Sequence, residues 1–215
     1  MSRKTLISWS SGKDSAWMLH VLRQDPKVNV VGLFCTVNEM FDRVTMHGVR
    51  IELLKQQAKS VNLPLHIVYI PYPCNNEQYA QVMTSFIVEA KKNDIECFAF
   101  GDLFLENVRE YRENLLKNTG IAPLFPIWGI STKNLSRQMI SEGLKAIITC
   151  INPKCIGEEF VGREYDESFL NDIPESVDPC GENGEFHSFA FFWANVSISD
   201  KDYFGKDCLP GCILL

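Results

Sequence analysis

The strongest constraint on the fold is an alternation of extended and helical segments along the first 130 residues. Short runs rich in β-branched and aromatic residues are followed by segments whose apolar residues recur every three to four positions. The pattern predicts strands at residues 5–9, 28–36, 65–70 and 97–100, and helices at residues 13–23, 49–61, 77–92 and 106–117. Strands alternating with helices form βαβ units. We therefore predict an α/β protein with a twisted parallel sheet, Rossmann-like, and helices on both faces.

The last third of the chain is less regular. Residues 135–142 look helical, residues 145–151 look like a strand, and residues 187–197 form an extended aromatic run. Residues 152–185 are rich in Pro, Gly and acids, which predicts loops and short turns. We place a boundary near residue 130, with a larger domain at residues 1–130 and a smaller α+β domain at residues 131–215. Residues 28–36 are nearly all apolar, so we expect that strand to be buried on both faces.

Composition narrows the class of protein. The chain has 215 residues, of which 46% are hydrophobic and 22% charged, as in an ordinary globular protein. The net charge of −6 argues against a surface built to bind nucleic acid, so tRNA is not an expected partner. The apolar run at residues 189–194 is too short to span a membrane, and the start of the chain lacks a secretory signal. We expect a soluble, cytoplasmic protein without membrane partners.

Eight cysteines raise the question of a disulfide framework or a metal site. They form no C-x-x-C pair, which argues against zinc-ribbon, thioredoxin-like and iron–sulfur sites. Several follow apolar runs, where cysteine behaves as a small hydrophobic residue. We predict reduced thiols in the core and the tail. The terminal Cys212-Ile213-Leu214-Leu215 fits a prenylation pattern, but no basic stretch precedes it, and we interpret it as an apolar tail.

A loop of small and polar residues separates the first predicted strand from the first predicted helix. Its sequence is Ser8-Trp9-Ser10-Ser11-Gly12-Lys13-Asp14-Ser15. Backbone N–H groups at a helix N-terminus bind anions, and the serine hydroxyls and the Lys13 ammonium would add to that site. Asp14 beside a phosphate suits Mg²⁺. The loop is not a Walker A motif, because Ile7 stands where that motif needs glycine and Asp14 follows the lysine.

This loop resembles the S-G-G-K-D-S loop of the N-type ATP pyrophosphatases, the PP-loop superfamily of adenine nucleotide alpha hydrolase-like proteins. Ser11 replaces the first glycine of that pattern. The resemblance implies a HUP-type sheet and an enzyme that uses ATP and Mg²⁺. It also implies cleavage of ATP between the α and β phosphates, which adenylates a substrate oxygen and releases pyrophosphate.

Two later segments resemble one branch of that superfamily, the diphthine–ammonia ligase family. Residues 101–113 match its helix entry, G-x-x-x-x-[DE]-x-x-R, with Arg109 and Glu113 on one helix face. Residues 178–187, Asp-Pro-Cys-Gly-Glu-Asn-Gly-Glu-Phe-His, match its late segment nearly letter for letter. The resemblance implies an ATP-dependent ligase that adenylates a carboxylate and forms an amide with ammonia. It implies that the larger domain binds ATP, and we expect the smaller one to bind the acceptor.

The resemblance assigns roles to individual residues, to which we add His47, which either faces the nucleotide or caps the second helix. The residues expected to contact ATP are Ser10, Ser11, Gly12, Lys13, Asp14, Ser15, His47 and Gly101. The expected catalytic residues are Lys13, Asp14, Arg109 and Glu185, and Asp14 is the expected Mg²⁺ ligand. The expected acceptor-binding residues are Glu113, Glu182, Asn183 and His187.

Several alternatives stay open at this stage. The family usually has S-D-Y-Q-R before the helix where this chain has residues 105–109, Leu-Glu-Asn-Val-Arg, so the acceptor can be other than diphthine. The acceptor is either a side-chain carboxylate of a translation elongation factor-like protein or a small molecule. Arg109 and Glu113 could form only a surface pair, and Asp178, Cys180, Glu185 and His187 could hold a metal. A tRNA-modifying enzyme and a non-catalytic ATP-binding sensor or assembly module are the alternative functions. We expect a homo-oligomer.

Overall fold

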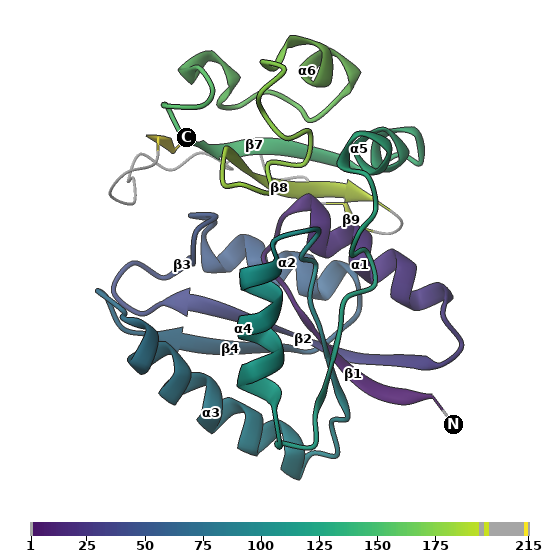
Figure 1. Cartoon of the computed structure of the whole chain (residues 1–215), viewed down its shortest axis with the longest axis vertical. Helices are drawn as coiled ribbons and strands as arrows, with labels where there is room; N and C mark the ends of the chain where they lie inside the picture. Colours follow the sequence, from purple (N-terminus) through teal and green to yellow (C-terminus); the bar gives the residue numbers. More distant parts are fainter. Residues whose placement is uncertain (1, 194–195, 198–212, 215) are drawn as a thin grey trace.

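The computed structural model describes residues 2–193, 196–197 and 213–214 of the chain, which fold around two sheets (Figure 1). Cys208 and Cys212 lie outside the described residues, and so does most of the expected apolar tail. Cys35, Cys74, Cys97, Cys155 and Cys180 are free thiols. No helix within the described ranges is long and apolar enough to cross a membrane.

The larger sheet is mostly parallel, as the alternating pattern predicts. Its central strand β1 (Arg3–Ser8) lies between β2 and β5, β4 pairs with β2, and β6 pairs with β5, all in parallel. The two-residue β3 pairs antiparallel with the end of β2. The bounds of these strands are β2 (Val28–Asn38), β3 (Arg43–Val44), β4 (Leu65–Ile70), β5 (Cys97–Ala99) and β6 (Ala122–Leu124).

The expectation that the second strand is buried on both faces is correct only for its second half. Burial begins at Gly32, and the four residues before it are half-buried or exposed. The cause is the register of the sheet, because β4 starts to pair with β2 only at Leu33. Before that residue, β2 has β1 as its neighbour.

Helices cover both faces of the larger sheet, because successive side chains of a strand point to opposite faces. Leu6 of β1 packs in a cluster with Met83 and Leu116, whereas the next residue, Ile7, packs in a cluster with Trp17 and Leu54. The first cluster lies under α3 (Asn76–Lys92) and α4 (Glu106–Leu116), and the second under α1 (Lys13–Gln24) and α2 (Ile51–Ser60). The α/β class with helices on both faces is confirmed.

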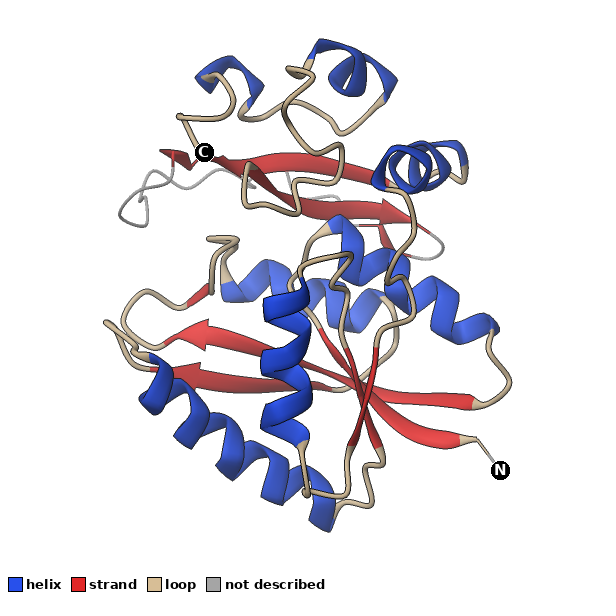
Figure 2. Ribbon diagram, viewed as in Figure 1, coloured by secondary structure: helices blue, strands red, loops and turns tan. Residues whose placement is uncertain are grey.

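A smaller antiparallel sheet lies on the other side of α1 and α2 (Figures 1 and 2). Its order is β10-β7-β8-β9. Its strands are β7 (Lys145–Ile151), β8 (Phe186–Trp193), β9 (Val196–Ser197) and β10 (Ile213–Leu214), and α5 (Thr132–Ser141), α6 (Glu167–Asp172) and the 3₁₀-helix η1 (Glu158–Phe160) accompany them. Trp17 of α1 and Ile148 and Phe189 of this sheet belong to one core cluster. The boundary near residue 130 stays a prediction, because one core continues across it.

Gln57 of α2 joins the two sheets by hydrogen bonds. Its side chain is fully buried, and its Oε1 accepts a hydrogen bond of 2.8 Å from Nε1 of Trp9. Its Nε2 donates to the carbonyl oxygens of Ser11, at 2.9 Å, and Ala190, at 2.7 Å. Trp9 and Ser11 follow β1, and Ala190 lies in β8, so one amide group connects the loop after β1 to the smaller sheet.

We predict that Gln57→Leu lowers the free energy of unfolding by about 3 kcal/mol, because buried polar groups lose their partners while the volume is kept. Chemical denaturation followed by circular dichroism measures this value. Gln56→Leu, a half-buried neighbour on the same helix, is the matched control and should change it by less than about 1 kcal/mol. Equal effects of the two substitutions would contradict the bridging role.

Candidate active site

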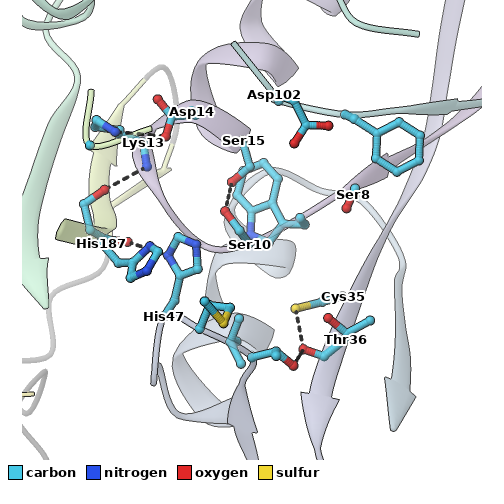
Figure 3. A pocket seen from close by; sticks show the side chains of 18 of the residues that line it. Ser8, Ser10, Lys13, Asp14, Ser15, Cys35, Thr36, His47, Asp102 and His187 are labelled. Atoms are coloured by element: carbon cyan, nitrogen blue, oxygen red, sulfur yellow. Dashed lines mark hydrogen bonds and ion pairs between the residues drawn. The ribbon is translucent and has the colours of Figure 1, made fainter. Parts of the chain in front are cut away.

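A cavity of about 390 Å³ opens at the carboxyl ends of β1, β2 and β5 (Figure 3). In open parallel sheets this edge is where ligands bind. Ser8 and Ser10 line it from β1, Cys35 and Thr36 from β2, and residues 100–102 from β5. Cys180, Gly181, Glu182, Gly184, Phe186, His187 and Ser188 close it from the side of the smaller sheet. Both parts of the chain therefore build the cavity.

The loop after β1 presents its hydroxyl groups and the start of α1 to the cavity. Ser10, Asp14 and Ser15 line it, and the hydroxyls of Ser10 and Ser15 lie 3.3 Å apart. The backbone N–H of Gly12 donates to Oγ of Ser10 at 3.3 Å. The N-terminus of α1 follows directly, so backbone donors, hydroxyls and the positive end of the helix dipole face one space.

Glycine is required at position 12 because a larger side chain would not fit there. Its backbone is extended, so its φ angle does not demand glycine. A Cβ atom there would lie 2.8 Å from Cε1 of His47 and 3.1 Å from the carbonyl oxygen of Ser188. Glycine thus allows the β3–α2 loop and β8 to approach the phosphate loop.

At Ser11 it is the backbone conformation, and not the space around the residue, that favours glycine. Its φ of 69° lies in the left-handed region, which costs a non-glycine residue about 1 kcal/mol or more. The side chain is fully buried, does not line the cavity, and its hydroxyl finds no hydrogen-bond partner among the described residues. The family pattern has glycine at this position, so the substitution leaves a strained residue inside the loop.

Lys13 lines the cavity, but its ammonium group points toward the smaller sheet. The side chain is 2% exposed; its Nζ pairs with Oδ2 of Asp14 at 2.9 Å and donates to the carbonyl oxygen of Cys180. The rings of Tyr165 and Phe186 lie 5.4 and 5.3 Å from Nζ. Burial alone would lower the pKa of Lys13, but Asp14, together with Cys180 and Glu182, more than offsets it, so the pKa is raised and the group stays charged.

Two histidines form a neutral pair beside the loop. The rings of His47 and His187 have centroids 4.7 Å apart, and Nδ1 of His47 donates to the carbonyl oxygen of Ser188 at 3.2 Å. Burial, with a smaller contribution from the charge of Lys13, lowers the pKa of His47 to about 4 and that of His187 to about 3. Both rings are therefore uncharged at neutral pH, and because Nδ1 of His47 carries the proton, its Nε2 can accept one.

Glu182 lines the same cavity as the histidines. Its Oε1 accepts a hydrogen bond of 2.7 Å from the backbone N–H of Leu103. Burial raises the pKa of Glu182 to about 7, and the carboxylates of Asp14 and Asp102 add to the shift, although the Leu103 hydrogen bond and Lys13 oppose it. At neutral pH this carboxyl group can both give and take a proton.

The structure also brings in residues that the sequence did not single out. Asp102 and Arg112 line the cavity, with Nε of Arg112 3.7 Å from Oδ2 of Asp102. Nη1 of Arg112 donates to the hydroxyl of Tyr79 at 3.3 Å. Arg112 follows Arg109 by three positions on α4, so helical spacing alone could have raised both as candidates.

Six predicted site residues lie outside the cavity wall: Ser11, Gly12, Arg109, Glu113, Asn183 and Glu185. Arg109 and Glu113 pair at 2.8 Å on the outer side of α4, and the guanidinium of Arg109 packs on the rings of Phe125 and Trp128. Glu185 is buried and its Oε1 accepts hydrogen bonds of 3.0 Å from the backbone N–H of Asp178 and from Nδ2 of Asn183. Glu185 and Asn183 thus order the 178–187 segment, and their catalytic or acceptor-binding roles stay predictions.

The structure gives no support to the mixed metal site. Within the part of the chain that the structure describes, no group of three or more His, Cys, Asp or Glu side chains is arranged to hold a metal ion. Burial raises the pKa of Cys180 to about 12, so its thiol is not a ready metal ligand.

Fold and site together define an α/β protein with a serine-rich loop and a cavity at the carboxyl edge of a parallel sheet, and a second sheet closes that cavity. The chain belongs to the diphthamide synthase family. The family model of the diphthamide synthase N-terminal domain matches residues 3–123, and that of the C-terminal domain matches residues 131–194. These matches confirm the family resemblance of the loop, the helix entry and the late segment.

The chain is also similar to individual diphthine–ammonia ligases. It is 23% identical to that of Homo sapiens and 25% identical to that of Bos taurus, each over 205 residues that cover 84% of this chain and 75% of the relative. It is 27% identical to that of Mus musculus over 124 residues, 54% of this chain and 45% of the relative.

We predict that Ser11→Gly raises the free energy of unfolding by about 1 kcal/mol, because it removes the left-handed strain and a buried hydroxyl without a partner. Greater freedom of glycine in the unfolded chain offsets part of that gain. Urea denaturation measures the difference. Ser11→Ala is the matched control, since it removes the hydroxyl but keeps the strain. A Ser11→Ala variant more stable than Ser11→Gly would show that the backbone is not strained there.

We predict that Glu182→Gln becomes more stabilising as the pH rises. A carboxyl group whose pKa is raised from 4.5 to about 7 on folding favours the folded state at low pH, and this contribution is lost as the pH rises from 4.5 through 7. Glutamine does not titrate and can still accept the Leu103 hydrogen bond. The difference in melting temperature between variant and wild type should therefore grow between pH 5 and pH 8.

Exposed Glu110 on α4 provides the control for this titration. The melting temperature of Glu110→Gln should follow that of the wild type across the same pH range. A difference for Glu182→Gln that stays constant with pH would contradict the assigned titration.

Proposed function

We propose that the protein is an ATP-dependent amide ligase that adenylates a carboxylate by cleaving ATP between the α and β phosphates and then transfers ammonia. The observation that carries this proposal is the shared cavity. The phosphate loop, a carboxyl group with a pKa of about 7 and two neutral imidazoles all face one space of about 390 Å³. Phosphate binding and proton removal are the two tasks that such a reaction requires.

The loop supports the phosphate part of the reaction. The hydroxyls of Ser10 and Ser15 and the N-terminus of α1 can donate to phosphate oxygens. These dipoles are fixed before the reaction, so they would stabilise the charge that develops on departing pyrophosphate. Lys13 contributes its charge through the cavity wall while its ammonium group stays paired with Asp14.

Asp14 fits the expected Mg²⁺ ligand. Its Oδ2 pairs with Lys13, but its Oδ1 is buried and has no hydrogen-bond partner among the described residues. An oxygen of this kind can hold Mg²⁺ together with phosphate oxygens, as magnesium sites with one or two carboxylates do. When bound, the ion would neutralise phosphate charge.

The histidines and Glu182 support the second step of the proposed reaction, the transfer of ammonia to the acyl adenylate. Attack of ammonia on an acyl adenylate forms the C–N bond, releases AMP and leaves one proton to be removed from the nitrogen. An efficient base for that proton has a pKa near the working pH. Glu182 has such a pKa, and neutral His47 offers its Nε2 as a hydrogen-bond acceptor.

The acceptor carries a carboxylate, and two sources are consistent with the site. The relatives are named diphthine–ammonia ligases, and a diphthine-like carboxylate on a translation elongation factor-like protein is the first source that we propose. The helix entry at residues 105–109 differs from the usual family pattern, which favours a different acceptor, including a small molecule. The tRNA-modifying and sensor alternatives gain no support from the family or the relatives.

Incubation with ATP, Mg²⁺, ammonium chloride and a diphthine-bearing elongation factor should yield AMP and pyrophosphate in equal amounts, measured by anion-exchange chromatography. Asp14→Ala should lower the rate by about 100-fold or more, because it removes the Mg²⁺ ligand and frees the Lys13 charge. Asp25→Ala, at the opposite end of α1, is the matched control and should keep the rate. Formation of ADP and phosphate would contradict α–β cleavage.

A further inference from the structure

Arg109, an expected catalytic residue, belongs to a surface outside the cavity. Its guanidinium lies 4.9 Å from the centre of the Phe125 ring and 4.8 Å from that of Trp128. This contact joins α4 to the segment that leads from β6 to α5, and the two lie side by side in Figure 1. The side chain of Arg109 is still 35% exposed. An arginine stacked on aromatic rings forms a flat, rigid surface, which protein interfaces favour.

Two exposed apolar side chains lie beside this stack. Phe104 is 39% exposed and Ile130 is 38% exposed. Their backbones are close together, because the backbone N–H of Gly129 donates to the carbonyl oxygen of Leu103 at 2.8 Å. Aromatic side chains and arginine are enriched at the centres of protein interfaces, so this composition marks an interaction surface. We call it the α4 patch, and its residues are Phe104, Arg109, Phe125, Trp128 and Ile130.

The same face of α4 offers both a donor and an acceptor. Nε of Arg109 donates to Glu113 at 2.8 Å, but its Nη groups donate to no protein atom among the described residues. Glu106 is exposed, lies three positions before Arg109 on α4, and pairs with no cation in the part of the chain that the structure describes. A second copy turned around a twofold axis brings its own Glu106 to Arg109 and its own Arg109 to Glu106.

The net charge of the chain makes this complementarity necessary for self-association. Two copies that each carry a charge of −6 repel each other unless opposite charges meet where they touch. On the α4 patch, the exposed guanidinium of Arg109 and the exposed carboxylate of Glu106 meet that condition. Charge pairs of this kind select the partner, and the apolar side chains supply most of the affinity.

The α4 patch is connected to the cavity through Leu103. This residue is buried, and its backbone N–H donates to Oε1 of Glu182 at 2.7 Å. Its carbonyl oxygen accepts from Gly129, and the next residue along the chain is Phe104 of the patch. A partner that covers the patch therefore contacts the loop that holds the Glu182 carboxyl group.

We propose that the α4 patch is the interface of a twofold-symmetric dimer of this chain. Arg109 of each copy pairs through its Nη groups with Glu106 of the other. Phe104 and Ile130 of each copy pack on the arginine–tryptophan stack of the other. The same face serves both copies, as in other isologous dimers. Arg109 then acts in assembly, whether or not the protein is a ligase.

Sedimentation velocity of the full chain without nucleotide, from about 1 to about 100 µM, tests the dimer. The wild type should form a dimer, and the double variant Phe104→Ser/Ile130→Ser should raise the dissociation constant by about tenfold or more. Met40→Ser/Val88→Ser removes two exposed apolar side chains elsewhere and is the matched control, which should keep the dissociation constant. A monomeric wild type, or a dimer equally stable in both double variants, would overturn the proposal.

Charge reversal tests the pairing across the twofold axis. Arg109→Glu and Glu106→Arg should each weaken the dimer by about tenfold or more, because like charges then face each other. An equimolar mixture of the two variants should form a dimer again, since opposite charges meet in the mixed pair. Arg137→Glu makes the same change of charge on another helix and should keep the wild-type dimer. Equal weakening by Arg137→Glu and Arg109→Glu, or no recovery in the mixture, would also overturn the proposal.

Discussion

The site depends on the hydrogen bonds that hold the loop after β1 against the smaller sheet. The carbonyl oxygen of Ser11 accepts from the backbone N–H of Ala190 at 3.0 Å and from Nε2 of Gln57 at 2.9 Å. The backbone N–H of Lys13 donates to Oγ of Ser188 at 3.2 Å. A phosphate-binding loop must keep its donors in place before the ligand arrives. Here β8 supplies that support, so the second sheet is part of the site.

The burial of Lys13 follows from the same arrangement. Its ammonium group satisfies Asp14 and the Cys180 carbonyl, and therefore anchors the 178–187 segment to α1. Burial keeps both histidines in the cavity neutral, and the charge of Lys13 adds to this lowering of their pKa. Lys13 thus contacts both the loop after β1 and the 178–187 segment, and it also affects the pKa of the histidines. In the proposed function, the phosphate contacts would therefore come from backbone donors and from the serines.

The sequence predicted the larger sheet well because alternating apolar strands and amphipathic helices are local patterns. It also located the phosphate loop, where Ser10, Asp14 and Ser15 do line the cavity. It could not distinguish Arg109 from Arg112, since helical spacing does not say which face of α4 meets Tyr79 and Phe100. The burial of Lys13 was equally hidden, because it depends on a segment more than 160 positions away.

The cavity combines carboxyl groups from both parts of the chain. Asp102 follows β5 of the larger sheet, and Glu182 belongs to the segment that precedes β8. The Oε1 of Glu182 reaches across to the backbone N–H of Leu103, and the carboxylate of Asp102 raises the pKa of Glu182.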